Sequence, residues 1–217
     1  MPLTILLHFF SVIMLVKKTL ADGFATPLTW NLGTNLTISI TDHQSTIEAA
    51  IQEVFNNGTS NASDDFFSIL AVYDLYNNQT SFKSPVTAYF TNNPFQSNQL
   101  NQGVDAMRAY RVYQNSTMLD IATQAWDFGR TLTISDANVV TGSIPSKLFN
   151  LTKTCSATLV GGTFWQTTVN DTTIYGISTA LFFTLSAYLY QATSDNTYLA
   201  AAQDSGAFLI DIMHITG

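Results

Sequence analysis

Apolar residues recur at three- and four-residue spacing along much of the chain, which is the pattern that one buried face of an α-helix produces. One such stripe covers residues 47–55 and stops at Asn57-Gly58. The next follows Ser63-Asp64-Asp65, where a capping serine and first-turn carboxylates are typical of a helix start, and it ends at Asn77-Asn78. Strand-like runs such as 36–40 are short and isolated. The pattern predicts an all-α fold.

Three segments share one motif, in which a helix ends in aromatic residues, a polar turn follows, and a second helix opens with Thr or Ser at its cap. They are residues 76–82, 113–119 and 190–199, the last with a short insertion. In the second helices Leu119 matches Leu199, and Ala122 matches Ala202. A helical hairpin does not bury its apolar face alone, so we expect tandem helical hairpins that stack into an array or close into a ring.

A long segment from Ser135 to Thr173 separates the second and third hairpins and contains Gly161-Gly162-Thr163-Phe164-Trp165. Long ordered segments in compact domains are usually functional. Paired glycines allow the backbone to approach a ligand closely, and a tryptophan offers a flat apolar face suited to stacking on a sugar ring. The same string also suits a tight turn with Trp165 plugging the core. For Trp126, which lies on a helical stripe, and for Trp30, a core position is the stronger expectation.

The composition is apolar and poor in charge, which narrows the classes of function. Apolar residues make up 46% of the 217 residues and charged residues 11%, and Asp plus Glu outnumber Lys plus Arg by 15 to 8. Nucleic-acid binding requires clustered Lys and Arg, which this chain lacks. It also has neither a phosphate-cradling glycine loop nor a Gly-Xaa-Ser-Xaa-Gly elbow. We therefore expect no nucleic acid, no nucleotide and no cofactor.

The first 21 residues are typical of a secretory signal peptide. The apolar stretch 3–16 is 14 residues long, fewer than the roughly 20 that a membrane-spanning helix needs, and Thr19-Leu20-Ala21 suits a cleavage site. The basic pair Lys17-Lys18 follows the apolar run, so an uncleaved membrane anchor is the alternative. We expect removal of residues 1–21, no transmembrane segment after that, and a protein secreted to the extracellular space or the cell wall.

Seven Asn-Xaa-Ser/Thr tripeptides are spread over the mature chain, which indicates passage through the glycosylation machinery. Each asparagine must lie at the surface if it is modified. The single cysteine, Cys155, has no partner for an internal disulfide, so either its partner lies outside this sequence or it is a small buried residue. The predicted glycosylation sites are Asn35, Asn57, Asn61, Asn78, Asn115, Asn150 and Asn170.

Acid–base and metal chemistry have few candidates in this chain. The three histidines, His8, His43 and His214, do not have the spacing of metal ligands. Glycoside hydrolysis needs two carboxyl groups, one protonated and one ionised. Asp64-Asp65 is the only adjacent carboxylate pair, and helix capping explains it as well. Asp105 is the other candidate, with a solvent-facing position as its alternative.

Several strings together point to a family. GGTFW at 161–165, ISTALFFTLSAYLYQAT at 177–193 and NTYLAAA at 196–202 resemble fungal members of glycoside hydrolase family 76. The segment AYRVYQNSTMLDIATQAWDF at 109–128 is similar to the family's upstream hairpin. The resemblance implies an (α/α)6 toroid of helical hairpins, with residues 22–217 forming part of it, and an activity on α-1,6-mannan.

The resemblance implies substrate contacts at Gly161, Gly162 and Trp165, but it places the family's catalytic pair of aspartates on Ser97 and Asn98. Neither of these two side chains exchanges a proton near neutral pH, so we expect no catalytic residue at that position. The chain is also shorter than a full ring of hairpins requires. We therefore expect a fragment, a mis-joined gene model or a degenerate relative of the family.

Three functions stay open on the sequence. The first is a secreted glycoside hydrolase-like protein that acts on or binds α-1,6-mannan, without activity where the aspartate pair is replaced. The second is a non-catalytic carbohydrate-binding or structural protein of the cell wall. The third is a helical-toroid hydrolase acting on unsaturated uronides. The scarcity of Lys and Arg disfavours the third, because acidic substrates need basic side chains in the cleft.

Overall fold

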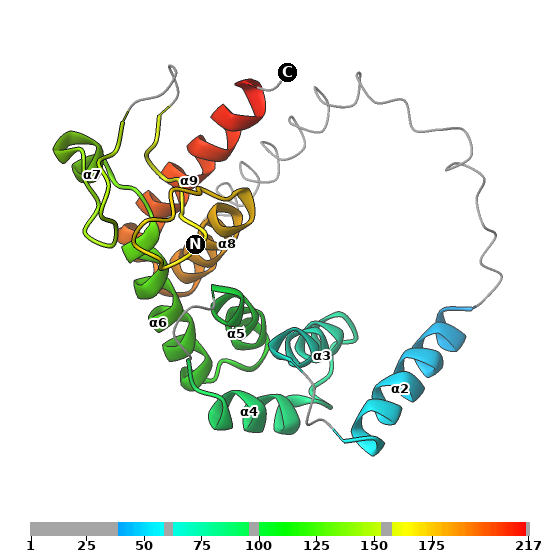
Figure 1. The fold of residues 1–217 in the computed structure, drawn as a ribbon. Helices are drawn as coiled ribbons and strands as arrows, with labels where there is room; N and C mark the ends of the chain where they lie inside the picture. The colour runs from blue at the N-terminus through cyan, green and yellow to red at the C-terminus, as the bar shows by residue number, and fades with distance from the viewer. Residues whose placement is uncertain (1–38, 59–62, 96–99, 153–157, 216–217) are drawn as a thin grey trace, which may run out of the picture. The chain divides into compact units, whose positions relative to one another are not determined.

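The computed structural model describes residues 39–58, 63–95, 100–152 and 158–215 (Figure 1). The chain divides into two compact units, Met1–Thr59 and Ser60–Gly217. The described part of the first unit is helix α2 (Ile40–Asn56), whose first turn is capped by the Ser39 hydroxyl. The apolar stripe at 47–55 lies on this helix, so the helix predicted there is confirmed.

In the second unit the regular elements of the described residues are all helices. The predicted all-α fold is therefore confirmed. The helices are α3 (Asp64–Tyr76), α4 (Lys83–Asn92), α5 (Leu100–Tyr113), α6 (Ser116–Leu132), α7 (Asp136–Thr141), α8 (Gly176–Thr193) and α9 (Asn196–Ile215).

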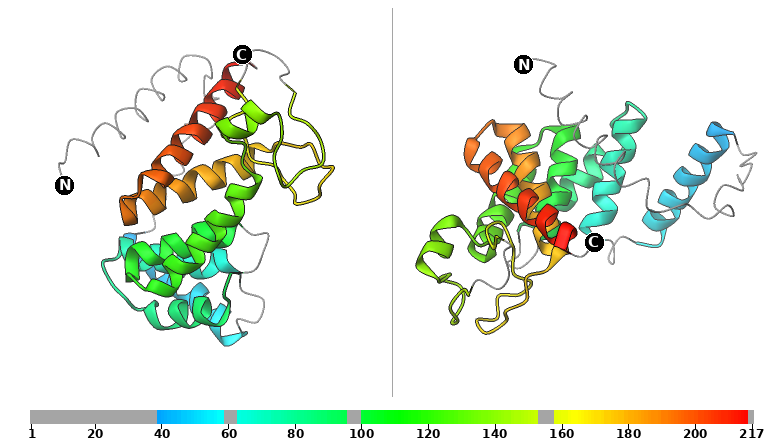
Figure 2. Two further views of the ribbon diagram at one scale, coloured as in Figure 1. Left: turned by 90° about the vertical axis from the view of Figure 1, so that its left-hand side faces the viewer. Right: turned by 90° about the horizontal axis from the view of Figure 1, so that it is seen from above.

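Six of these helices pair into three consecutive hairpins, α3–α4, α5–α6 and α8–α9, as the repeated motif predicts. The first helices of the hairpins form one row, in which α5 packs against α3 and against α8 (Figure 1). Helix α6 packs on α5 and also contacts α4 and α8. Figure 2 shows α8 and α9 running side by side. The hairpins thus stack as an array, and the closed ring that the resemblance implies stays a prediction.

The turns of the second and third hairpins are built alike. Gln114 and Ser194 each adopt a left-handed backbone, with φ of 52° and 61°. The next residue caps the second helix: Asn115 Oδ1 accepts a hydrogen bond from the amide two residues on at 2.9 Å, and Asp195 Oδ1 does the same at 2.8 Å. The expected insertion and the expected Ser or Thr caps are wrong, because a left-handed residue followed by Asn or Asp makes both turns at one length.

A buried carboxylate holds the first hairpin. Asp74 is 0% exposed, and its Oδ2 accepts hydrogen bonds from the Phe82 amide at 2.8 Å and from the Tyr113 hydroxyl at 2.7 Å. Hydrogen bonds of this kind offset part of the cost of burying a polar group. Burial, and then the hydrogen bond to Asp74, raise the pKa of Tyr113. Asp74 therefore ties α3 to the start of α4 and to the end of α5.

Trp126 lies in the core between the second and third hairpins, as its position on a helical stripe predicts. Its side chain is buried, and its indole Nε1 donates a hydrogen bond to Ser186 Oγ at 2.8 Å. The ring stacks on Phe182, with centroids 5.6 Å apart. The expectation for Trp30 lies outside the described residues.

The long segment between α6 and α8 folds over a small core of its own. Within it, Thr163 and Phe164 form bridges to neighbouring segments. The Phe164 amide donates to the Leu132 carbonyl at 3.0 Å, and the Trp165 amide donates to the Thr173 carbonyl at 2.9 Å. These contacts leave isolated bridges in place of regular strands. The buried residues of this core are Leu132, Ile134, Ile144 and Phe164.

Gly161 places this segment directly on helix α9. Its φ is 88°, in the left-handed region that favours glycine. Its carbonyl accepts a hydrogen bond from Ser205 Oγ at 3.0 Å, and its amide donates to the Ile134 carbonyl at 2.8 Å. A Cβ at position 161 would overlap the Asp204 carbonyl. The backbone of residue 161 therefore packs so closely on α9 that no side chain fits between them.

Substitution of this glycine should destabilise the protein strongly. We expect Gly161→Ala to lower the free energy of unfolding by roughly 3 kcal/mol or more, because the new methyl group meets both a disfavoured φ and the backbone of α9. The matched control is Gly176→Ala at the start of α8, where a Cβ meets no atom within 4 Å. Urea unfolding should show that control unchanged or slightly stabilised, and equal stability of the two variants would contradict the contact.

Candidate functional site

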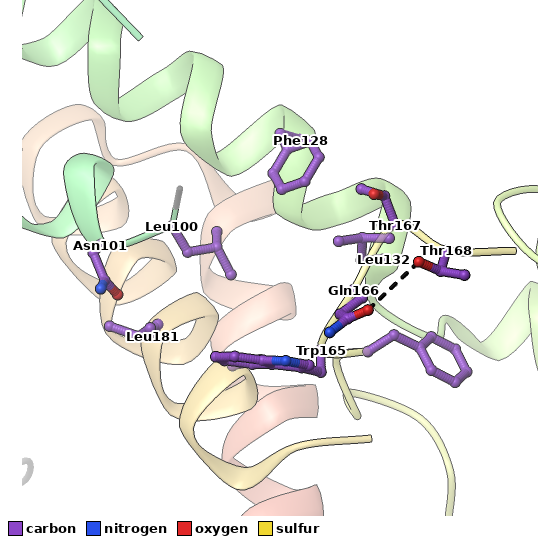
Figure 3. A pocket seen from close by; sticks show the side chains of 11 residues that line it. Leu100, Asn101, Phe128, Leu132, Trp165, Gln166, Thr167, Thr168 and Leu181 are labelled. Carbon is purple, nitrogen blue, oxygen red and sulfur yellow. Dashed lines mark hydrogen bonds between the residues drawn. The ribbon is translucent and has the colours of Figure 1, made fainter. Parts of the chain in front are cut away.

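A pocket of about 400 Å³ lies where three helix ends meet the segment that follows Gly162 (Figure 3). The N-terminal ends of α5 and α8 form two of its walls, the C-terminal end of α6 forms a third, and residues 164–168 close it. The lining residues are Leu100, Asn101, Phe128, Leu132, Phe164, Trp165, Gln166, Thr167, Thr168, Ser178 and Leu181.

Trp165 lies along one side of this pocket. Figure 3 shows its indole ring edge-on, with Leu100 and Phe128 on one side of the ring plane. The side chain is 51% exposed and packs against Tyr175, with ring centroids 4.9 Å apart. The alternative in which Trp165 plugs the core is therefore wrong, because an indole so exposed fills no core.

The two glycines before it lie elsewhere. Gly161 and Gly162 are buried and line no part of the pocket. A Cβ at Gly162 would meet the ring of Phe208 at 2.9 Å, so the close approach that these glycines allow is made by helix α9. Of the three residues expected to contact substrate, the structure brings Trp165 alone to the pocket. Gly161 and Gly162 affect the pocket only indirectly, because they set the course of the backbone that leads to Trp165.

The polar groups of the pocket are amides and hydroxyls. Asn101, Gln166, Thr167, Thr168 and Ser178 contribute them, and no lining residue among those described carries a charge. Such groups both donate and accept hydrogen bonds, as a neutral hydroxyl-rich ligand requires. An anionic ligand would meet no positively charged side chain in the lining. The pocket is therefore suited to an uncharged polar ligand with an apolar face.

Thr163 anchors the pocket wall, and sequence reasoning missed this role. It is fully buried, its amide donates to Thr179 Oγ1 at 3.0 Å, and its hydroxyl lies 2.9 Å from that of Thr133. These two partners are 16 and 30 residues away in the chain. Local sequence patterns do not reveal hydrogen bonds between residues so far apart in the chain. The only signal in the sequence was that Thr163 directly follows the glycine pair.

The family's catalytic position cannot be placed in this site. Ser97 and Asn98, onto which the resemblance maps the aspartate pair, lie outside the described residues. The first described residues after them, Leu100 and Asn101, line the pocket. The expectation that no catalytic side chain occupies positions 97 and 98 rests on their identity and stays a prediction.

The candidate carboxylates that the sequence singled out separately come together across α3 and α5. Asp105 is 1% exposed, so its solvent-facing alternative is wrong. Its Oδ1 accepts from Ser68 Oγ at 2.7 Å and forms an ion pair with Arg108 at 2.8 Å. Burial above all, and repulsion from Asp65, raise the pKa of Asp105 to about 6, although Ser68 and Arg108 oppose the rise.

Asp64 lies at the same end of the helix row. Burial raises its pKa, Asp65 adds to the rise, and hydrogen bonds from Tyr89 and Gln102 oppose it. Gln102 also donates to the Asn93 carbonyl at 3.1 Å, so it links this carboxylate to the end of α4. Helix capping does not describe the pair fully: Ser63 makes no side-chain cap, and Asp64 faces α4 and α5.

Four of the predicted glycosylation sites are exposed in the described residues, as modification requires. Asn115 is half-buried, with its Oδ1 on the first turn of α6. Asn35, Asn61 and Cys155 lie outside the described residues. The exposed acceptors are Asn57, Asn78, Asn150 and Asn170.

The described residues contain neither a cluster of metal ligands nor a membrane-spanning helix. Within the described ranges, no three His, Cys, Asp or Glu side chains gather as a metal site would require. Among the described helices, none has the length and apolar character needed to cross a bilayer. His8 lies outside the described residues, and the side chains of His43 and His214 are not described either.

Comparisons with protein-family models, with curated proteins and with solved structures found no match to this chain. The family resemblance therefore depends on the quoted motifs.

Asp105 should give the protein a pH-dependent stability of defined sign. Its pKa is about 6 in the folded chain against an ordinary 3.8, so the folded state keeps a proton that the unfolded state releases. The contribution of Asp105 to stability is then greatest below about pH 4, falls as the pH rises to about 6 by up to roughly 3 kcal/mol, and levels off above that.

The change that tests this is Asp105→Asn, compared with Asp120→Asn at an exposed position of α6. Urea unfolding between pH 4 and 7 should show a flatter profile for D105N than for wild type, while D120N follows wild type. An unchanged slope in D105N would contradict the assignment.

Proposed function

We propose that this protein binds a neutral α-mannan chain at the Trp165 pocket, as a secreted glycoside hydrolase family 76-like protein. The observation that carries the proposal is the half-exposed indole of Trp165 beside a pocket whose polar lining has no charge. A sugar ring presents an apolar C–H face and a hydroxyl-rich edge. The first suits the indole and the second suits amides and hydroxyls.

The uncharged lining also favours a neutral glycan over an acidic one such as an unsaturated uronide. Unsaturated uronides carry a carboxylate on each uronic-acid residue, and binding it in a pocket favours a positively charged side chain that pairs with it. No lining residue among those described supplies one. The choice of mannan among neutral glycans comes from the family resemblance, and the linkage is proposed on that ground.

The proposed location is outside the cell. It rests on the signal-like residues 1–21 and on the exposed glycosylation acceptors. A glycan-binding surface and N-linked glycans of its own are both expected of a secreted or cell-wall protein.

Removal of the indole should weaken glycan binding selectively. We expect Trp165→Ala to reduce affinity for α-1,6-manno-oligosaccharides roughly thirtyfold, equivalent to about 2 kcal/mol, because the stacking face is lost. The control is Tyr76→Ala, which removes another exposed aromatic ring, 84% exposed on α3 and outside the pocket lining. Isothermal titration with both variants measures the difference.

Wild-type affinity in Y76A together with weak binding in W165A supports the proposal. Saturable binding that is equal in all three proteins would move the site away from Trp165. Absence of binding to any neutral glycan would overturn the proposed function.

Hydrolysis is the second candidate function, and one observation favours it. Asp105, with its raised pKa, interacts with Asp65, and glycoside cleavage uses two carboxyl groups, one of which donates a proton to the leaving oxygen. Asp105 would donate a proton to the leaving oxygen, and the exposed Asp65 would act as base or nucleophile. Because Asp105 is buried and lines no part of the described pocket, binding remains the first proposal.

Release of reducing ends from α-1,6-mannan distinguishes the two candidates. Turnover by the wild type that falls at least a hundredfold in both Asp65→Asn and Asp105→Asn would establish hydrolysis by these carboxyls. Saturable binding with no release of reducing ends would leave binding as the function. Turnover unaffected by either substitution would place catalysis on other residues.

A further inference from the structure

A buried lysine lies behind the pocket wall. Lys147 is 6% exposed, and its Nζ donates hydrogen bonds to the Gln166 carbonyl at 2.7 Å and to the Thr168 carbonyl at 2.9 Å. The ammonium also lies 4.7 Å from the centroid of the Phe164 ring. All three of its contacts are therefore residues that line the pocket.

Burying this charge is costly, so the contacts that accept it are informative. Removal of an ammonium group from water costs several kcal/mol unless other groups compensate. Among the described side chains, no carboxylate lies within 4.0 Å of the Lys147 ammonium group. Burial accordingly lowers the pKa of Lys147, with the charge of Asp171 opposing the shift. Two backbone carbonyls and the face of the Phe164 ring thus stabilise the ammonium group.

Neighbouring backbone bonds reinforce the same segment. The Leu148 amide donates to the Val169 carbonyl at 3.0 Å, directly beyond the two carbonyls that Lys147 holds. On the other side the Trp165 amide is bonded to the Thr173 carbonyl. Residues 165–169 contain no helix of their own, so their conformation depends on these few bonds.

We propose that Lys147 is a positioning residue for the ligand pocket: its ammonium fixes the Gln166–Thr168 wall and the Phe164 ring, so that the wall's amide and hydroxyl groups stand preformed for a neutral glycan. The part that concerns glycan affinity rests on the proposed function. Preorganisation of this kind raises affinity because the ordering of the wall is not paid for on binding.

The test compares Lys147→Met with Lys83→Met. Methionine keeps most of the volume of the lysine stem and removes the donors and the charge, and Lys83 is an exposed lysine at the start of α4. In the ligand-free protein we expect K147M to speed hydrogen exchange of the Trp165 and Leu148 amides about tenfold and to shift the indole resonance of Trp165. K83M should match wild type in both measurements, and Lys147→Arg, which restores charge and donors, should recover part of the protection.

Affinity for α-1,6-manno-oligosaccharides is the second measurement. We expect K147M to bind about tenfold more weakly than K83M and the wild type, with K147R between them. Wall amides that exchange as slowly in K147M as in wild type would overturn the inference. Faster exchange with unchanged affinity would overturn its link to binding.

Two further outcomes keep the conclusions separate. If wild type binds no neutral glycan, the proposed function fails, and the exchange data still decide whether Lys147 orders the wall. If K147M does not fold, Lys147→Gln takes its place with the same measurements, and slow exchange at Trp165 and Leu148 in that variant would overturn the inference.

Discussion

The contact between the Gly161 backbone and helix α9 determines where the rest of the long segment can go. The φ of 88° at Gly161 and the hydrogen bond from Ser205 to its carbonyl fix the direction in which the backbone continues. The four residues that follow then pass between α6 and α8, and the fourth of them is Trp165. A side chain at position 161 would lift the segment from the helix. The exposed position of the Trp165 indole therefore depends on the packing of Gly161 against α9.

The pocket depends equally on how the hairpins stack. Helices α3, α5 and α8 are each the first helix of a hairpin, and their N-terminal ends come together: Asp64 interacts with Gln102, and Asn101 and Ser178 line one pocket. Stacked repeats place equivalent positions side by side, so polar side chains at the same end of each hairpin come close together. The acidic residues of α3 and the Trp165 pocket thus lie at the same end of the array, although the acidic residues line no part of the pocket.

Local patterns in the sequence predicted the elements well, because helix periodicity and the hairpin repeat are local properties. The predicted caps were wrong in identity, since Asn and Asp cap a helix as well as Ser and Thr do. Local patterns also identified Trp165 but not the partner of the glycines, because a backbone that admits a close neighbour looks the same whether that neighbour is a sugar or a helix.

The supports of the pocket lay beyond sequence reasoning altogether. Thr163 finds its partners 16 and 30 residues away, and Lys147 reaches carbonyls 19 and 21 residues away, in a segment with no repeating pattern. The approach of Asp105 to Asp65 likewise requires knowing that α5 packs on α3. These pairings are set by the stacking of elements, and a single sequence contains no direct signal for them.

Glycan binding at the Trp165 pocket can be located by chemical-shift mapping of the isotope-labelled protein during titration with α-1,6-manno-oligosaccharide. We expect saturable shifts to concentrate on the Trp165 indole and on the amides of Asn101, Gln166 and Thr168, which line the pocket. Shifts of equal size on the outer face of α3 around Tyr76, or none at Trp165 when binding is saturated, would contradict binding at this pocket.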